Sequence, residues 1–435
     1  MSESKRFLFV TWDGGGNVPP ELALARRLRA RGHAVRVLAD PTIEPDVRAS
    51  GCEFSAWTTA PHRTTRDRSG DIFKDYEIKS PMKMIDTYMR EFLAVPAPRW
   101  VADTRAELEA RPADVVVVDF ALPAALIAPQ ALGLPTATLM PNIWMVPIPG
   151  IPPIGPGFLP ARSVLGRGRD ALLGHLMRRI FQKALPALNA ARQSAGLSPA
   201  RDVYEQLLGA QRILVQTSPV FDFTSPHMPS NVSYVGPELG DPAWIAEPGA
   251  PRWQPPGAPD DRRPLVLVGL SSTFQNQVAT LRRIVEALSS LELRALLTLG
   301  PTLDPSEVPG SANVTVVRSA PHREVLEHAA LLITHAGHGT TLKGLAAGVP
   351  VLCLPMGRDQ NDTAARVVHS GAGLRLPPDS AAPNIAKAVS RLLGEPAFRA
   401  GAQRLARAIA TREGQSDAIE LLESLAAKRS ASVAA

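Results

Sequence analysis

Residues 6–40, RFLFVTWDGGGNVPPELALARRLRARGHAVRVLAD, alternate between two apolar segments and one helical segment. The apolar, β-rich run at residues 6–12 predicts a strand, and residues 33–40 predict a second strand. Between them a Pro-Pro pair opens a helical pattern, because proline loses no backbone hydrogen bond at a helix start. This strand–helix–strand order predicts a parallel sheet with right-handed crossovers.

The same alternation continues along the chain and restarts after a break. The valines at residues 115–118 predict a strand that is buried on both faces. Residues 241–264 are dense in Pro and Gly and carry no apolar period, which indicates a linker. Beyond the linker, PLVLVGLS at residues 264–271 starts a second series of strands.

We therefore expect an α/β fold with two doubly wound, Rossmann-like domains that face each other across a cleft. In such sheets ligands bind at the carboxyl ends of the strands. The predicted division is an N-terminal domain over residues 1–240, a linker over 241–264, a C-terminal domain over 265–412, and a last helix with a loose tail over 413–435.

Composition narrows the class of protein. The chain has 435 residues, of which 45% are hydrophobic, so the length favours more than one domain. The net charge is +6, but the arginines are dispersed and form no basic–aromatic cluster, so a nucleic-acid partner is not expected. Two cysteines are too few for a disulfide framework or a zinc site.

No apolar run reaches membrane-spanning length and no signal peptide is evident, which predicts a cytoplasmic protein. Nothing in the sequence indicates an oligomeric state.

The strongest motif is LLITHAGHGTTLKGLAAGVPVLCLPMGRDQNDTAARV at residues 331–367. A strand is expected to end at Thr334, and a helix is expected to begin near Gly339 or Thr340. The start of a helix exposes backbone N–H groups and the positive end of the helix dipole, so this turn predicts a phosphate site. One strand later, Asp359 and Gln360 place a carboxylate beside an amide, a pair suited to sugar hydroxyl groups.

This ordered set resembles the donor-binding motif of nucleotide-sugar glycosyltransferases with the GT-B fold. The similarity is greatest to the UDP-glycosyltransferase and macrolide-glycosyltransferase-like family. The family pattern begins with H-x-G, two further residues and Ser or Thr; it continues with G-[VI]-P, a later Pro and the pair D-Q. The matching residues are His335, Gly337, Thr340, Gly348, Val349, Pro350, Pro355, Asp359 and Gln360. The resemblance extends over nearly the whole chain. It implies an N-terminal acceptor-binding domain, a C-terminal nucleotide-sugar-binding domain and a last helix that crosses back to the N-terminal domain.

The resemblance also implies roles for the donor-site residues. His335 and Thr340 would contact the pyrophosphate, while Asp359 and Gln360 would contact the donor sugar. The remaining expected donor-site residues lie in neighbouring turns: Ser271 and Ser272 near the phosphates, Pro321 and His322 beside the nucleotide base, and Gly337, His338 and Gly339 in the phosphate turn. His338 stands where plant relatives carry Trp.

The first turn of the chain departs from two known patterns. As a dinucleotide fingerprint it has Gly14 and Gly16 but Pro19 where a third glycine is needed, so we reject an NAD site. Compared with the glycosyltransferase family, the same turn aligns with the element G-H-x-x-P. The catalytic His of the family then falls on Asn17.

An asparagine cannot take the proton of the acceptor, so another group must serve as the general base. Asp119 matches the Asp that orients the family's His, and burial would raise its pKa. Asp13 in the first turn is a rival, and His62 is a third candidate. A fourth possibility is that the acceptor is an acidic phenol or an activated carbon, so that no strong base is needed. Asn17 could then hydrogen-bond the acceptor. The catalytic candidates are Asp119, Asp13 and Asn17.

The acceptor pocket is expected from loops of the N-terminal domain. The Pro-rich stretch at residues 140–161 is either a surface loop or the wall of an apolar pocket. Candidate acceptor-binding residues are Trp12, Phe120, Trp144 and Met145, together with the region at residues 73–92. An apolar lining would suit a lipophilic natural product such as a polyketide, macrolide or flavonoid.

The resulting prediction is an inverting glycosyltransferase of the hexosyltransferase type that moves a sugar from a UDP- or TDP-sugar to a small hydrophobic acceptor. The chain has no D-x-D triplet, so we expect neither a metal nor another cofactor, and the charge on the departing diphosphate would meet the helix start, His335 and hydroxyl groups. One alternative is a nucleotide-sugar epimerase on the same fold. Another is a non-catalytic nucleotide-sugar-binding helper protein, which Asn17 keeps open.

Overall fold

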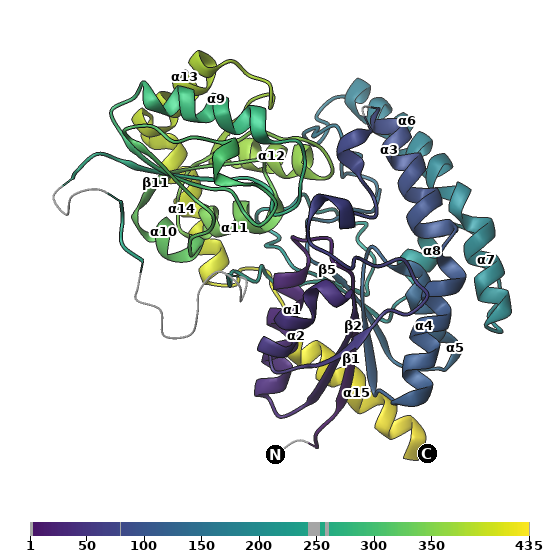
Figure 1. The fold of residues 1–435 in the computed structure, drawn as a ribbon. Coiled ribbons are helices and arrows are strands. Elements are labelled where there is room, and N and C mark those ends of the chain that lie inside the picture. The colour runs from purple at the N-terminus through teal and green to yellow at the C-terminus, as the bar shows by residue number, and fades with distance from the viewer. Residues whose placement is uncertain (1–2, 79, 242–252, 257–260, 435) are drawn as a thin grey trace.

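The structure, a computed structural model, describes residues 3–78, 80–241, 253–256 and 261–434. It contains two parallel β-sheets, each covered by helices on both faces (Figure 1). The first sheet has seven strands in the order β3-β2-β1-β4-β5-β6-β7, and the second has six in the order β10-β9-β8-β11-β12-β13. The chain is thus an α/β protein with two doubly wound, Rossmann-like domains, as predicted.

The strands of the first sheet are β1 Arg6–Val10, β2 Ala34–Ala39, β3 Glu53–Ala56, β4 Val115–Asp119, β5 Thr136–Met140, β6 Arg212–Val215 and β7 Val232–Tyr234. Those of the second are β8 Leu265–Gly269, β9 Arg294–Thr298, β10 Val314–Val317, β11 Ala329–Thr334, β12 Val351–Cys353 and β13 Gly373–Arg375. The α-helices of the first half are α1 Val18–Ala30, α2 Glu44–Ala49, α3 Pro81–Thr87, α4 Ala97–Ala110, α5 Ile127–Ala131, α6 Val164–Phe181, α7 Leu185–Ser194 and α8 Val203–Leu207. Those of the second half are α9 Val278–Ser289, α10 His322–His328, α11 His338–Ala346, α12 Gln360–His369, α13 Ala382–Gly394, α14 Pro396–Ala410 and α15 Ala418–Ala434.

The strand order creates a ligand-binding edge in each sheet. In the first sheet β1 lies between β2 and β4, and in the second β8 lies between β9 and β11. At these positions successive crossovers leave in opposite directions, which opens a crevice at the carboxyl ends of the strands. Asn17 follows β1, Asp119 ends β4 and His335 follows β11. The topology therefore brings the main predicted site residues to the two crevices.

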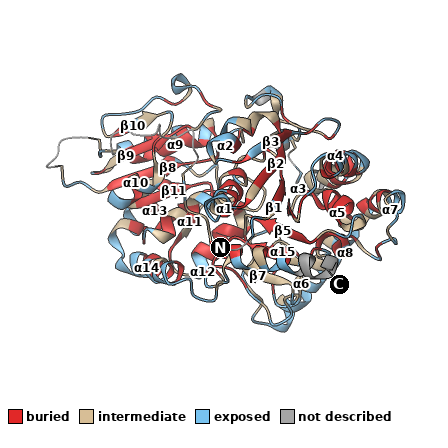
Figure 2. Cartoon of the chain, turned by 90° about the horizontal axis from the view of Figure 1, so that it is seen from below, coloured by how far each residue is buried: buried red, intermediate tan, exposed pale blue. Residues whose placement is uncertain are grey.

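Burial follows from the parallel topology. Figure 2 shows the strands in red inside both halves and the outward helix faces in pale blue. All five residues of β4 are buried, in agreement with the run of valines. Cys52 and Cys353 are buried and unpaired, as their strand-like surroundings predict. Among the described residues, no helix combines the length and apolar character needed to cross a bilayer.

The last helix returns to the first sheet. Ile419, Leu422 and Leu425 of α15 pack in one hydrophobic cluster with Phe7 and Val117 of β1 and β4. In Figure 1 the yellow α15 lies alongside β1. The helix continues to Ala434, so the tail that we expected to be loose is helical as far as the structure describes it, which agrees with the helix preference of alanine. Residues 242–252 and 257–260 of the predicted linker lie outside the described residues.

Candidate active site between the two sheets

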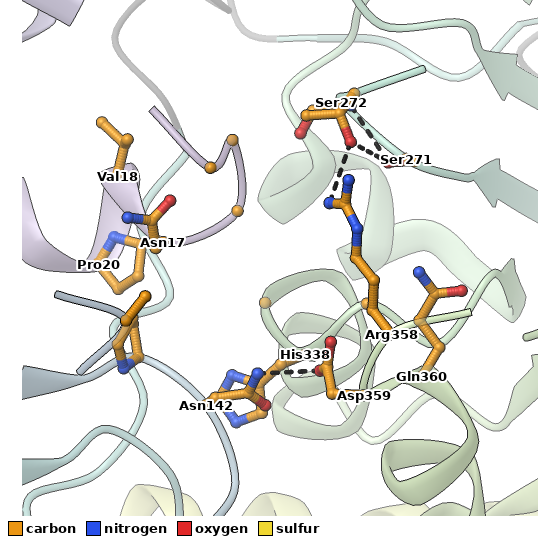
Figure 3. Close-up of a pocket in the computed structure, with 18 of the residues that line it drawn as sticks. Asn17, Val18, Pro20, Asn142, Ser271, Ser272, His338, Arg358, Asp359 and Gln360 are labelled. Atoms are coloured by element: carbon orange, nitrogen blue, oxygen red, sulfur yellow. Dashed lines mark hydrogen bonds between the residues drawn. The ribbon is translucent and has the colours of Figure 1, made fainter. Parts of the chain in front are cut away.

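A cavity of about 1000 Å³ lies between the carboxyl ends of the two sheets. Figure 3 shows Asn17 on one side of it, with Arg358 and Asp359 on the other. Most of the residues that the sequence singled out line this cavity: Trp12, Asp13, Asn17, Asp119, Phe120, Met145, Ser271, Ser272, His322, His335, Gly337, His338, Gly339, Thr340, Asp359 and Gln360. The fold thus brings residues as far apart in the sequence as Trp12 and Gln360 into one chamber.

Trp144 and Pro321 do not contribute to this lining. The Trp144 side chain is fully buried in the hydrophobic cluster of the first half, and its backbone N–H donates to Asp222 Oδ2 over 2.7 Å. The next residue, Met145, faces the cavity instead. Trp144 therefore supports the cavity wall as a core residue and does not form the acceptor pocket as we expected. Pro321 stands immediately before α10, where it caps the start of that helix.

The first turn approaches the second half very closely. Gly15 has a φ of +84°, and a Cβ atom built on it would lie 2.7 Å from the methyl group of Thr273 and 3.2 Å from Ser272 Oγ. Only glycine adopts this backbone conformation without strain and leaves room for that contact. The glycines of the first turn thus allow the catalytic candidates to lie close to the turn after β8.

Asn17 is held against Asp119. Its Nδ2 donates to Asp119 Oδ2 over 2.8 Å and to the carbonyl oxygen of Trp12 over 2.9 Å. The other Asp119 oxygen accepts from the backbone N–H of Ala121 over 2.6 Å. Asn17 Oδ1 is buried and has no hydrogen-bond partner among the described residues. Burial raises the pKa of Asp119 above its usual value.

The rival carboxylate, Asp13, is already engaged. Its Oδ2 accepts from the Thr42 hydroxyl over 2.7 Å, and its backbone N–H donates to Asp40 Oδ2 over 2.9 Å. Burial raises the pKa of Asp40 to about 6. The third candidate, His62, contacts the carbonyl oxygen of Ala60 through Nδ1 over 2.8 Å, and it is not among the described residues that line the cavity. Asp119 and Asp13 thus both line the cavity with hydrogen-bonded oxygens, whereas His62 lies outside its described lining.

The predicted phosphate turn opens α11, which begins at His338, slightly earlier than expected. Ala336 has a φ of +66°, a left-handed conformation that costs energy for a residue with a Cβ and that turns the chain from β11 into the helix. Burial lowers the pKa values of His335 and His338 to about 3 each. Both imidazoles are therefore neutral at neutral pH. His338 Nε2 is buried without a partner among the described residues.

Arg358 is a cavity residue that the sequence analysis did not single out. Its Nη1 lies 3.4 Å from Thr273 Oγ1, and Thr273 Oγ1 in turn contacts Ser271 Oγ over 3.1 Å. The guanidinium group also lowers the pKa of His335, after the larger effect of burial. Its position immediately before Asp359 was a signal in the sequence that could have identified it. Among the described residues, no group of three or more His, Cys, Asp and Glu side chains is arranged to hold a metal ion.

The two predicted sugar-binding residues have different surroundings. Asp359 Oδ2 accepts from Asn142 Nδ2 over 2.9 Å, a contact between the two halves of the molecule that Figure 3 shows as a dashed line. Burial raises the pKa of Asp359. Gln360 Oε1 accepts from the backbone N–H of Met356 over 2.7 Å, and its Nε2 donates to Gln275 Oε1 over 2.8 Å. Asp359 thus faces the opposite wall, whereas Gln360 holds its own turn in place.

His322, predicted to lie beside the nucleotide base, lines the cavity near the end of β8. Its Nε2 lies 2.9 Å from Thr298 Oγ1, and burial lowers its pKa to about 4. A Cβ atom on Gly269 would lie 2.7 Å from the His322 ring, so the end of β8 has no room for a side chain there.

The Pro-rich segment is a wall of the cavity and not a free surface loop. Its residues Pro147, Pro153 and Ile154 are part of the lining. Asp362 of α12 accepts from the backbone N–H of Gly155 over 2.7 Å and of Gly157 over 3.1 Å. The segment therefore reaches across from the first half and is fastened to the second.

A buried ion pair also joins the halves. Arg366 Nε donates to Asp222 Oδ1 over 2.6 Å, and both side chains are almost completely buried. Arg366 also stacks over the Phe223 ring, with the guanidinium carbon 4.2 Å from the ring centroid. Together with the Pro-rich segment, this pair holds the two walls of the cavity in a fixed relation.

Comparison with known proteins agrees with the two-domain fold. Residues 283–425 match the family described as Erythromycin biosynthesis protein CIII-like, C-terminal domain. The chain is 30% identical to 4'-demethylrebeccamycin synthase of Lentzea aerocolonigenes over 97% of this chain and 99% of that protein. Among solved structures, the calicheamicin glycosyltransferase CalG4 matches with a TM-score of 0.74 at 23% identity, over 98% of this chain and 99% of that one. The glycosyltransferase VinC in complex with DTDP matches with a TM-score of 0.68 at 19% identity, over 98% of this chain and 100% of that one.

Proposed function

Because this chain belongs to the GT-B family of UDP-glycosyltransferases and is a glycosyltransferase, we propose a specific reaction for its central cavity. The enzyme transfers a sugar from a UDP- or TDP-sugar to a small hydrophobic natural-product acceptor, with inversion at the anomeric carbon and without a metal ion. The observation that carries this proposal is one chamber with the start of α11 on one side and the Asn17–Asp119 pair on the other.

The donor side supports a nucleoside diphosphate. Backbone N–H groups at the start of α11 lie beside His335, His338 and the hydroxyl of Thr340. Such a helix start binds phosphate oxygens through N–H groups and the helix dipole. Arg358 also lines the cavity and adds a full positive charge close enough to His335 to lower its pKa. The DTDP in the VinC structure is consistent with a thymidine nucleotide here, and the family resemblance equally admits UDP.

The chemical step is a direct displacement. The acceptor's nucleophilic atom forms a bond to the anomeric carbon, while the bond from that carbon to the diphosphate oxygen breaks. Asp119 takes the acceptor's proton, and the nucleoside diphosphate leaves with the electron pair. Attack from the face opposite the leaving group inverts the anomeric centre. Arg358 and the start of α11 stabilise the charge that develops on the diphosphate.

The acceptor side supports a lipophilic molecule. Its lining combines Trp12, Phe120 and Met145 with Met177 and Phe181 from the end of α6. Large apolar side chains with a few polar groups at one end are the usual lining of a pocket for a small molecule. The relative 4'-demethylrebeccamycin synthase is named for a natural product, in agreement with an acceptor of this class.

A mass-gain assay tests the proposal. The enzyme is mixed with UDP-sugars or TDP-sugars and a panel of aromatic and macrolide acceptors, and the products are analysed by mass spectrometry. A gain of one sugar mass on an acceptor, with release of the nucleoside diphosphate, is the expected result. A changed sugar on an intact donor would indicate an epimerase, and binding without any conversion would indicate a helper protein. Either outcome would refute the proposed function.

Metal independence gives a second prediction. We expect turnover to be unchanged, within a factor of about two, after treatment with excess EDTA, because Arg358 and the start of α11 supply the charge stabilisation that a divalent ion supplies elsewhere. The measurement is the initial rate before chelation, after chelation, and after magnesium or manganese is added back. Loss of activity that either metal restores would contradict it.

A further inference from the structure

A second carboxyl group lies behind Asp119. Glu21 is in the first turn of α1, one helical turn beyond Asn17, and its backbone N–H donates to the Asn17 carbonyl oxygen over 3.4 Å. Its side chain is only 2% exposed. Glu21 is not among the described residues that line the cavity, whereas Asp119 is. The side chain therefore contacts the site from inside the protein.

Among the described residues, no positively charged side chain forms an ion pair with Glu21. Its polar neighbours are Thr11, Asn17 and Asp119, and the Glu21 and Asp119 carboxyl groups are hydrogen-bonded to each other. Within the described part of the chain, Glu21 Oε1 has no hydrogen-bond partner. The other titratable group near Asp119 is Tyr88; burial and the Asp119 charge raise the pKa of this phenol, which therefore remains neutral.

Two carboxyl groups in contact and without a cation cannot both be ionised, so they share one proton. Burial raises the pKa of Glu21 well above its ordinary value, and the neighbouring Asp119 raises it further. The hydrogen bond from Glu21 lowers the pKa of Asp119, because it stabilises the Asp119 carboxylate. The proton therefore resides on Glu21, and the negative charge resides on Asp119.

We propose that Glu21 is a positioning residue that holds the shared proton and directs the charge of the pair onto Asp119 at the cavity surface. This inference rests on the proposed function, in which Asp119 is the general base. The protonated Glu21 and the Asn17 amide then both donate to the Asp119 carboxylate and orient it toward the acceptor. When Asp119 takes the acceptor's proton, the pair becomes neutral, and it returns to one negative charge when that proton leaves to solvent.

A measurement of stability against pH tests the proton independently of activity. A folded-state pKa above the unfolded-state value means that the native protein binds more protons, so Glu21 lowers stability progressively as the pH rises toward its folded pKa. Glu21→Gln removes this pH dependence of stability while keeping the size of the side chain and a hydrogen-bond donor. From pH 6 to pH 8 we expect the unfolding equilibrium constant of the wild type to rise relative to that of Glu21→Gln, by at most about tenfold per pH unit, which is the limit for one proton; urea unfolding measures it.

Asp103→Asn is the matched control for this measurement. Asp103 is a buried carboxylate of the same half that accepts from Thr58 and Thr59 and is not part of the described cavity lining. Its pKa is lowered, so its removal reduces stability by a constant amount between pH 6 and pH 8 and changes the pH dependence of stability only in acid. Parallel stability curves for the wild type and Glu21→Gln over that range would refute the inference that Glu21 holds a proton.

The pH dependence of kcat/KM tests the positioning role. We expect the acidic limb of the kcat/KM profile to move to higher pH by about half a unit in Glu21→Gln, because an amide is a weaker hydrogen-bond donor than a carboxylic acid. In Glu21→Leu, which has no donor, the limb should move by about one unit or more. Asp103→Asn should keep the wild-type limb. An unmoved limb in both Glu21 variants of an active enzyme would refute the inference. A wild-type enzyme that transfers no sugar would instead refute the proposed function.

Discussion

Asp119→Asn lowers kcat by about a thousandfold, while the dissociation constant for UDP or TDP stays unchanged. A general base contributes typically 10²- to 10⁴-fold, and asparagine cannot accept the acceptor's proton. The nucleotide is expected at the start of α11, on the opposite wall of the cavity, so its affinity should not depend on Asp119. Initial rates and isothermal titration calorimetry measure the two quantities.

Asp13→Asn is the matched control for this substitution. Asp13 lines the same cavity and is also a buried carboxylate, but it accepts from Thr42 and its loss should cost turnover much less than the loss of Asp119. The reverse order of effects would make Asp13 the base. Full activity of both variants would support the remaining alternative, in which an acidic acceptor needs no strong base. A series of acceptors of rising acidity then distinguishes the cases, because the loss in Asp119→Asn should shrink along the series.

Arg358→Gln lowers kcat/KM by about a hundredfold to a thousandfold and weakens the binding of the nucleoside diphosphate. Removal of one group that stabilises charge in a transition state typically has this effect. Arg358 lies beside the Ser271 and Thr273 hydroxyl groups and close enough to His335 to lower its pKa. Because burial keeps His335 and His338 neutral, these imidazoles add no charge, and Arg358 supplies a full positive charge near His335 in our proposed donor site.

Two further variants identify the origin of that loss. Arg358→Lys keeps the charge but not the planar guanidinium, so it should recover only part of the activity. Arg318→Gln removes one positive charge from a more exposed part of the cavity lining and should cost less than tenfold. Equal losses in Arg318→Gln and Arg358→Gln would show a general electrostatic effect, and they would contradict a direct contact between Arg358 and the diphosphate.

Much of the fold was predictable because local patterns and topology rules agree. The run of valines in β4, the Pro-Pro start of α1 and the Pro- and Gly-rich break near residue 250 each predict one element or boundary, and parallel crossovers leave few ways to connect them. The donor motif was recognisable because His335 and Asp359 follow strands whose carboxyl ends meet at one edge.

The errors and omissions concern the direction and surroundings of side chains. Trp144 resembled a pocket residue, but its neighbour Met145 faces the cavity and Trp144 belongs to the core. No role was predicted for Glu21, an acidic residue in the first turn of a helix, where the helix dipole favours a negative charge. Its partner Asp119 ends β4, which lies nearly a hundred residues further along the chain.

The sequence by itself determined the two parallel sheets, the position of the donor motif and the absence of an imidazole at Asn17, because each depends on local periodicity or on residue identity. The tertiary structure alone decided which charged groups touch. The contacts between Glu21 and Asp119, between Asn142 and Asp359, and between Arg366 and Asp222 join distant segments. Protonation and charge stabilisation depend on distance and burial in the folded chain, and neither quantity can be read from the order of residues.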